Sequence, residues 1–178
     1  GYAAKFPADC KKSEAHYEAL CNALVDQQRA DGSWGSPVQN TFAPLALMAS
    51  SKSSHKKAVK AAARFHADTT GGKDERWLVN WYYNPAGSVL AEYYLQTEEK
   101  WVLPELQEIY DFLISTQYMD PSQINPKSHE THPGAVPTRP GQKEGGWGHN
   151  PGFEGYGPIQ MITAQGALAF ALMKECGI

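Results

Sequence analysis

A tryptophan flanked by glycines occurs twice in this chain, each time between two segments of helical character. The first occurrence is DGSWG, which ends at Gly35, and the second is GGWG, which ends at Gly148. Each one follows an amphipathic segment and precedes a segment that is apolar on nearly all sides. Because a helix that is apolar all round is buried on all sides, the pattern predicts outer helices that cover inner helices.

The hydrophobic spacing predicts three such pairs of helices. Apolar residues at helical spacing indicate outer helices at about 13–28, 53–68 and 104–117. The inner segments are about 40–50, 84–96 and 157–175. Asn40 or Thr41 is the predicted N-cap of the first inner helix. In the second, Asn84 is the predicted N-cap and Pro85 the first helical residue, where a missing N–H costs nothing.

Composition fits a single all-α domain over residues 1–178, with a long loop at about 118–146. No segment shows sustained period-two alternation, so no β-strand is required. The net charge of -3 gives no reason to expect nucleic acid or an anionic membrane as a partner. No apolar run approaches the ~20 residues of a spanning helix. The 3 cysteines are too scattered for a disulfide framework or a zinc site, and we expect no cofactor and no metal.

One sequence motif resembles the repeat of a known protein family. The stretch QRADGSW, residues 28–34, fits the Gln-x(2–5)-Gly-x-Trp pattern of the repeat found in squalene and terpene cyclases. GGWG fits its Gly-x-Trp half, although Gln117 lies too far upstream to complete the linear pattern. On these residues the chain resembles the α/α-toroid superfamily, and GGWGHNPGFEGYGP is similar to uncharacterised bacterial proteins with this fold. The resemblance implies three αα-hairpins that form half of an α/α toroid.

The motifs of the best-known toroid reactions are missing from the sequence. The chain has no DxDD acid motif of triterpene cyclases and no DDxxD motif of isoprenoid synthases. It also lacks a GCGEQ-like thioester segment, and no Asp, Cys and His trio stands out as the zinc site of a prenyltransferase. A terpenoid cyclase-like enzyme is therefore only the third functional hypothesis.

Aromatic and polar residues precede or begin the inner segments. In toroids these positions surround one mouth of the central cavity. Flat aromatic rings beside amides suit a sugar, which has an apolar face and a set of hydroxyls. We expect a saccharide-binding rim whose substrate-binding residues are Trp81, Tyr82, Tyr83, Asn84, Asn150 and Arg139. The alternative, in which these side chains fill space between hairpins and cap helices, stays open.

Three further residues form the catalytic hypothesis. His149 with Glu154 or Tyr156 could act as an acid/base pair, since histidine titrates near neutral pH. In a polysaccharide lyase, Arg139 or Arg76 would neutralise a uronate carboxylate. Hydrolysis would need two facing carboxylates, and only Glu154 is well placed. His149 could equally be a structural loop residue.

The sequence thus predicts a carbohydrate-active module, either polysaccharide lyase-like or the sugar-binding part of such an enzyme. The alternative is a non-catalytic scaffold or binding segment of a larger protein. Because half a toroid leaves its inner helices exposed at two edges, we expect the remainder of a longer chain or a second copy as a partner. The cluster of His129, Glu130 and His132 is a weak metal signal, and Lys56, Lys57 and Lys60 indicate a solvated outer face.

The sequence leaves the cellular compartment open. The chain begins at Gly1 without a methionine, so we expect a segment upstream of it. An export signal in that segment would place the domain in the periplasm or outside the cell.

Overall fold

The computed structural model describes residues 11–71, 76–151 and 157–178, and all regular secondary structure in these ranges is helical. The elements are α1 (Lys11–Gln27), α2 (Pro37–Met48), α3 (Ser53–Asp68), α4 (Asn80–Thr97), α5 (Val102–Ser115), the 3-10 turn η1 (Pro121–Gln123), α6 (Pro126–Thr131) and α7 (Gln160–Glu175). The all-α prediction is confirmed. None of the described helices combines the length and apolarity needed to cross a bilayer.

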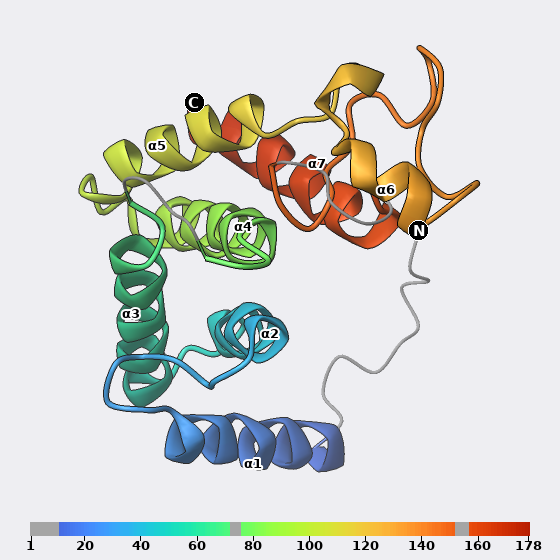
Figure 1. Cartoon of the computed structure of the whole chain (residues 1–178). Helices are drawn as coiled ribbons and strands as arrows, with labels where there is room; N and C mark the ends of the chain where they lie inside the picture. The colour runs from blue at the N-terminus through green and yellow to red at the C-terminus, as the bar shows by residue number, and fades with distance from the viewer. Residues whose placement is uncertain (1–10, 72–75, 152–156) are drawn as a thin grey trace, which may run out of the picture.

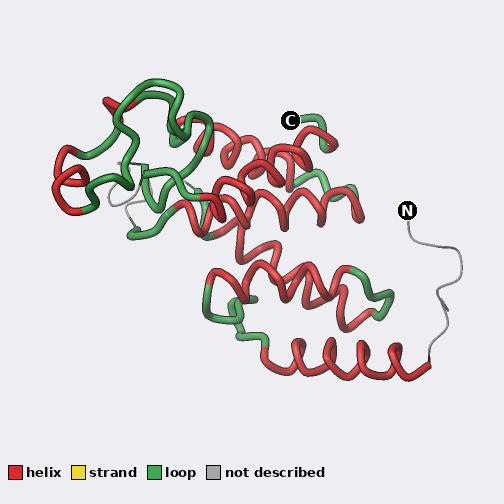
Figure 2. The backbone as a smooth tube through the Cα atoms, turned by 90° about the vertical axis from the view of Figure 1, so that its right-hand side faces the viewer, coloured by secondary structure: helices red, strands yellow, loops and turns green. Residues whose placement is uncertain are grey.

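The long helices form two layers that curve into an open arc (Figure 1). Helices α1, α3 and α5 make the outer layer, and α2, α4 and α7 make the inner layer. Helix α4 lies at the centre of the arc and packs against α2, α3, α5 and α7. Figure 2 shows the helices from the side, with the longest stretch of loop gathered at one end of the molecule. The core therefore has α4 as its axis.

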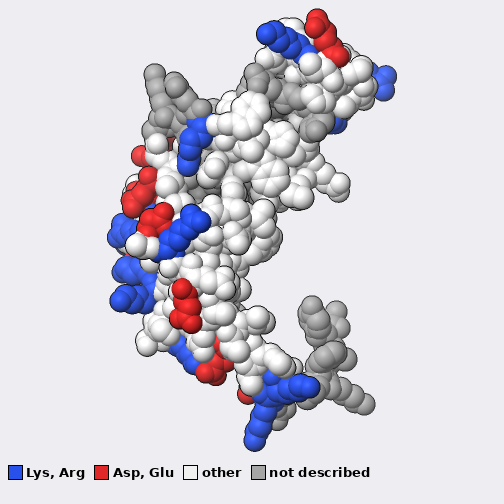
Figure 3. Space-filling view, turned by 60° about the horizontal axis from the view of Figure 1, so that its bottom comes forward, with Lys and Arg blue, Asp and Glu red and all other residues white. Residues whose placement is uncertain are grey.

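Sequence pattern explains which helix faces are buried. Helix α3 buries Ala62, Ala63 and His66 on its predicted apolar stripe and presents its lysines to solvent. In Figure 3, charged side chains follow one flank of the curved body, whereas the hollowed side is largely uncharged. The inner helices at the two edges keep apolar side chains exposed: Phe42 on α2 and Met161 on α7 are each 60% exposed.

Helix α2 begins before the predicted cap residues. Ser36 is its N-cap, with Pro37 in the first helical turn, and Ser36 and Gln39 form a reciprocal capping box. The prediction that Asn40 or Thr41 caps this helix was therefore wrong. The capping box satisfies the first backbone N–H groups, so the helix starts earlier than its apolar pattern suggests.

Helix α4 also begins earlier than predicted, because a distant loop completes its N-terminus. The backbone N–H of Asn80 donates to the carbonyl of His149 at 3.2 Å, and its side-chain amide donates to Gly148 at 2.9 Å. Asn84 and Pro85 therefore lie inside the helix, and the prediction that they form its N-terminus was wrong. A tertiary contact overrides the local Asn-Pro signal here.

The long loop predicted at about 118–146 contains more structure than expected. It holds η1 and α6, and Tyr118, Ile124 and Val136 bury one another in a small second core. These contacts give the segment an apolar anchor of its own.

The two tryptophan turns share one hydrogen-bond pattern. The side-chain amide of Gln28 donates to the carbonyl of Gly32 at 3.0 Å, and that of Gln117 donates to Gly145 at 2.8 Å. Both glycines have positive φ, 88° and 80°. Gln117 thus makes the same hydrogen bond as Gln28, although Gln117 is too far from its glycine in the sequence to fit the linear motif.

The tryptophans of these turns occupy equivalent places as well. The indole N–H of Trp34 donates to the carbonyl of Leu24 at 2.8 Å, and that of Trp147 donates to Leu113 at 2.9 Å. Each acceptor lies four residues before the glutamine of its turn. Both rings are buried, so each tryptophan ties the end of an outer helix to the start of an inner one.

Candidate functional site

The predicted rim centres on a pair of rings that the fold brings together across the sequence. Trp81 is the second residue of α4, and His149 follows the second tryptophan turn. The indole N–H of Trp81 donates to Nδ1 of His149 at 2.9 Å. The ring planes differ by 21°, with centroids 6.1 Å apart. Both side chains are half-buried, so the pair forms a partly exposed aromatic plate.

This hydrogen bond determines how His149 carries its proton. Because Nδ1 accepts from Trp81, the neutral imidazole has its hydrogen on Nε2. Burial lowers the pKa of His149 below its ordinary value, which also favours the neutral ring. The lone pair that a general base needs is occupied by the indole N–H. The geometry therefore suits His149 as a hydrogen-bond donor rather than as a proton acceptor.

Tyr82 lies next to Trp81 and is paired with a cation. The guanidinium carbon of Arg76 lies 4.2 Å from the centroid of the Tyr82 ring. Arg76 also donates a hydrogen bond to the carbonyl of Thr69, which fixes its position. The tyrosine ring and the positive charge thus meet at the same end of α4.

Asn150 joins the same region through the backbone of the α4 entry. Its Oδ1 accepts from the N–H of Val79 at 3.2 Å. Its Nδ2 is buried and has no hydrogen-bond partner within the described part of the chain. Buried polar atoms of this kind are usually satisfied by ordered water, so the shown role of Asn150 is to hold the start of α4 through Val79.

Two predicted substrate-binding residues lie in the core instead. Tyr83 is 1% exposed and stacks on Phe112 with ring centroids 3.6 Å apart, and Asn84 is fully buried. Because α4 starts five residues earlier than predicted, these residues lie within the helix and on its buried side. The expectation that they line a ligand surface is therefore corrected, whereas Trp81, Tyr82 and Asn150 lie together at the rim.

The remaining predicted residues are not brought to this pair. Arg139 is an exposed residue of the segment 119–144, and no contact joins it to Trp81 or His149 among the described residues. Glu154 and Tyr156 lie outside the described residues. The catalytic hypothesis thus retains His149 as its single placed member.

The histidines of α6 do not assemble a metal site within the described ranges. No group of three His, Cys, Asp or Glu side chains with metal-binding proximity is present there. His129 is exposed on α6, and Nδ1 of His132, which follows the helix, lies 2.9 Å from the hydroxyl of Thr131.

Sequence reasoning missed a cavity at the other end of the inner helices. It has a volume of about 470 Å³ and lies where the C-terminal ends of α2 and α4 meet the start of α3. The lysines of its edge were predicted only as a solvated face. The sequence shows that these lysines share one face of a helix. It does not show that apolar residues of α2 and α4 lie beside them, because those residues come from distant segments.

Comparison with known proteins identifies the family. Residues 13–178 match the model of a domain of unknown function, DUF6288, and the chain belongs to that family. No curated protein matches the chain. No solved structure matches it either.

Proposed function

We propose that this DUF6288 domain is a carbohydrate-binding module built as half of an α/α toroid. One observation carries the proposal: Trp81 and His149 are hydrogen-bonded into a partly exposed plate at the start of the central inner helix. Sequence segments 68 positions apart cooperate to hold these rings. A surface of this construction suits a ligand that has both an apolar face and hydroxyl groups.

The neighbouring groups favour a particular kind of sugar. His149 and Asn150 place polar groups beside the plate, where the hydroxyl or carboxylate oxygens of a sugar would lie. Arg76, held over the ring of Tyr82, adds a positive charge. We infer that acidic saccharides such as uronates bind more tightly than neutral ones.

Binding is supported better than turnover. A lyase must remove a proton next to the uronate carboxylate, and the Nδ1 lone pair of His149 already accepts from Trp81. The lyase-like alternative would therefore assign the base to another residue, such as Tyr156 of the sequence hypothesis. Formation of unsaturated uronate products, followed by ultraviolet absorbance, separates this alternative from simple binding.

Titration calorimetry against uronate oligosaccharides and matched neutral oligosaccharides tests the proposal. Trp81→Ala should weaken binding roughly tenfold or more, as loss of a central aromatic anchor does. Trp77→Ala is the matched control, because Trp77 is a strongly exposed tryptophan at 65% that precedes α4. Absence of saccharide binding, or equal weakening by both variants, would contradict a site at Trp81.

A second candidate function is a structural segment of a larger assembly. It is favoured by the apolar side chains that α2 and α7 expose, which include Val38, Phe42, Met161 and Leu168. In this alternative, further helices cover the two edges of the arc. Sedimentation analysis distinguishes the possible sources: a mass that rises with concentration indicates a second copy, and a constant monomer mass favours further helices of a longer chain.

A further inference from the structure

A second ligand site can be argued at the opposite end of the inner helices. The cavity of about 470 Å³ is formed by α2, α3, α4 and the turn before α5. Tyr93, in its wall, follows Trp81 of the rim by twelve positions on α4, which corresponds to about 18 Å along the helix. The cavity is therefore separate from the saccharide rim.

The inner wall of the cavity is apolar and comes from the core. Leu47 of α2, Val59 of α3 and Tyr93 of α4 line it, and each of them belongs to the buried core. Since three different helices fix these side chains, the cavity has a preformed apolar wall. Its volume lies within the ~300–1,000 Å³ that is typical of small-molecule sites.

The outer edge of the cavity is positively charged. Lys56, Lys57 and Lys60 of α3 line it together with a single acidic residue, Glu99. Lys60 pairs with Glu99 at 2.8 Å. Neither Lys56 nor Lys57 has an ion-pair partner in the described ranges, so the edge retains a surplus of positive charge.

Both oxygens of the Glu99 carboxylate already accept hydrogen bonds. Its oxygens accept from Lys60 at 2.8 Å and from the indole N–H of Trp101 at 2.5 Å. These hydrogen bonds, with a further one from Tyr93, lower the pKa of Glu99 to about 2. Glu99, the one acid of the lining, thus pairs with Lys60, and no ion pair joins it to Lys56 or Lys57 among the described residues.

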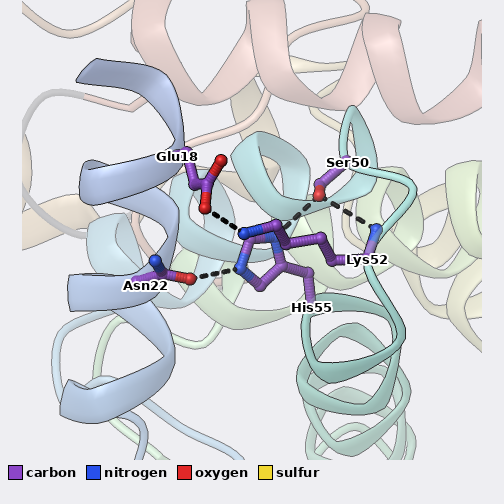
Figure 4. Close-up of polar contacts among 5 residues, drawn as sticks. All are labelled: Glu18, Asn22, Ser50, Lys52 and His55. Atoms are coloured by element: carbon purple, nitrogen blue, oxygen red, sulfur yellow. Dashed lines mark hydrogen bonds and ion pairs between the residues drawn. The ribbon is translucent and has the colours of Figure 1, made fainter. Parts of the chain in front are cut away.

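A polar network fixes the start of α3, from which these lysines project (Figure 4). Nδ1 of His55 lies 2.7 Å from the hydroxyl of Ser50, and Nε2 lies 3.0 Å from Oδ1 of Asn22. The same serine accepts from the backbone N–H of Lys52, whose side chain pairs with Glu18. The charge of Lys52 is therefore neutralised locally, and the first turn of α3 is held against α1 and α2.

We propose that this cavity binds an organic anion with an apolar body, of the class of aryl or medium-chain carboxylates. The apolar wall formed by Leu47, Val59 and Tyr93 requires the apolar body, and Lys56 and Lys57 require the anionic group. A small inorganic anion would leave the wall without a partner. A neutral hydrocarbon would gain nothing from the two lysines.

Titration calorimetry with three probes tests both halves of this site. The probes are 1-naphthoate, 1-naphthalenemethanol with the same rings but no charge, and acetate with the charge but no rings. We expect 1-naphthoate to bind and the other two to bind at least about tenfold more weakly. Equal affinity for the alcohol, or no saturation by 1-naphthoate, would overturn the proposal.

Charge variants locate the anion. The double variant Lys56→Gln/Lys57→Gln should weaken 1-naphthoate binding roughly fivefold to tenfold, as loss of two exposed charge contacts does. The matched control is Lys11→Gln/Lys12→Gln, which removes the same charge from exposed positions at the start of α1. Equal weakening by both double variants would assign the effect to net charge and overturn the site.

A measurement on the unmutated protein does not depend on how the variants fold. Nuclear Overhauser contacts from the naphthoate ring protons to the methyl groups of Met48 and Val59 are expected, because both residues line the cavity. Contacts to Phe42 or Met161 instead would place the probe on the exposed inner faces and refute binding in the cavity.

Discussion

The two tryptophan turns reach the same geometry with very different lengths of chain. In the first turn, residues 30–31 alone separate Arg29, two residues after the end of α1, from Gly32, the glycine of the motif. In the second turn, residues 119–144 occupy the same place. Both turns close with a backbone hydrogen bond of 2.8 Å, from Arg29 to Ser33 in the first and from Tyr118 to Gly146 in the second.

The two turns differ in the side chain that bonds the tryptophan to the inner helix. The backbone N–H of Trp34 donates to the side chain of Asn40 at 2.6 Å, and that of Trp147 donates to the hydroxyl of Thr163 at 3.1 Å. Asn40 and Thr163 are each the fourth residue of their helix. In the first turn, the buried His66 also lies 3.0 Å from the backbone carbonyl of Asn40, and no described histidine takes the corresponding place at Thr163. The comparison shows that side-chain and backbone bonds define the turn, whereas sequence spacing does not.

Replacement of either turn tryptophan should have the largest effect on the free energy of unfolding. The size of that effect should differ between the two turns. Trp147→Ala is expected to lower the free energy of unfolding by about 3–5 kcal/mol, because the ring is 2% exposed and contacts Phe170 edge-on. Trp34, at 6% exposed, should lie nearer the lower end of that range. Urea unfolding measures both. A larger cost for Trp34→Ala would reverse the comparison.

Acid should weaken the first turn through His66. Burial lowers the pKa of His66 from 6.5 to about 4, and its Nε2 lies 3.0 Å from the carbonyl of Asn40. Between these two pH values the unfolded chain binds a proton that the folded chain does not, so stability is lost as pH falls through this window. The expected loss by pH 4 is on the order of 2–3 kcal/mol.

Urea unfolding between pH 7 and pH 4 measures this loss. His66→Gln provides the control, since its amide can donate to the same carbonyl without titrating. If the variant keeps the full pH dependence, other groups carry the acid sensitivity.

Shortening the second turn should have the smallest effect. Replacement of residues 119–144 by Ala-Asp, the pair at 30–31, is expected to change the free energy of unfolding by about 1 kcal/mol or less. A shorter loop costs less entropy to close, and this gain opposes the loss of the contacts of Tyr118 with Ile124 and Val136. Circular dichroism and urea unfolding measure the outcome. A loss of helix content would show that the insertion is part of the core.

The helices were predictable because their patterns are local. The stripe of α3 is buried as expected, including Val59, Ala62 and Ala63. On α1, Cys21 is buried, whereas its neighbour Leu20 is 66% exposed. Helix α1 lies at the end of the arc, where α2 and α3 are the described helices that it contacts (Figure 1).

The site was harder to predict because its parts meet only in three dimensions. The start of α4 depends on carbonyls near His149, which no local signal at Asn84 or Pro85 could reveal. The linear motif excludes Gln117 because its glycine lies far along the chain. In the structure, however, the Gln117 amide donates directly to the carbonyl of Gly145. The pairing of Trp81 with His149 follows from the same docking of distant segments.

A backbone hydrogen bond closes the second turn at the two ends of its inserted segment, residues 119–144. Tyr118 and Gly145 are bonded to each other, since the N–H of Gly145 donates to the carbonyl of Tyr118 at 2.8 Å. Chain inserted between them leaves and returns at one fixed point, so the added length places little mechanical load on the helices. The pair Arg29 and Gly32 has the corresponding bond at 3.0 Å. We therefore expect the first turn to tolerate a segment inserted between Arg29 and Gly32. This is the position at which the second turn contains residues 119–144.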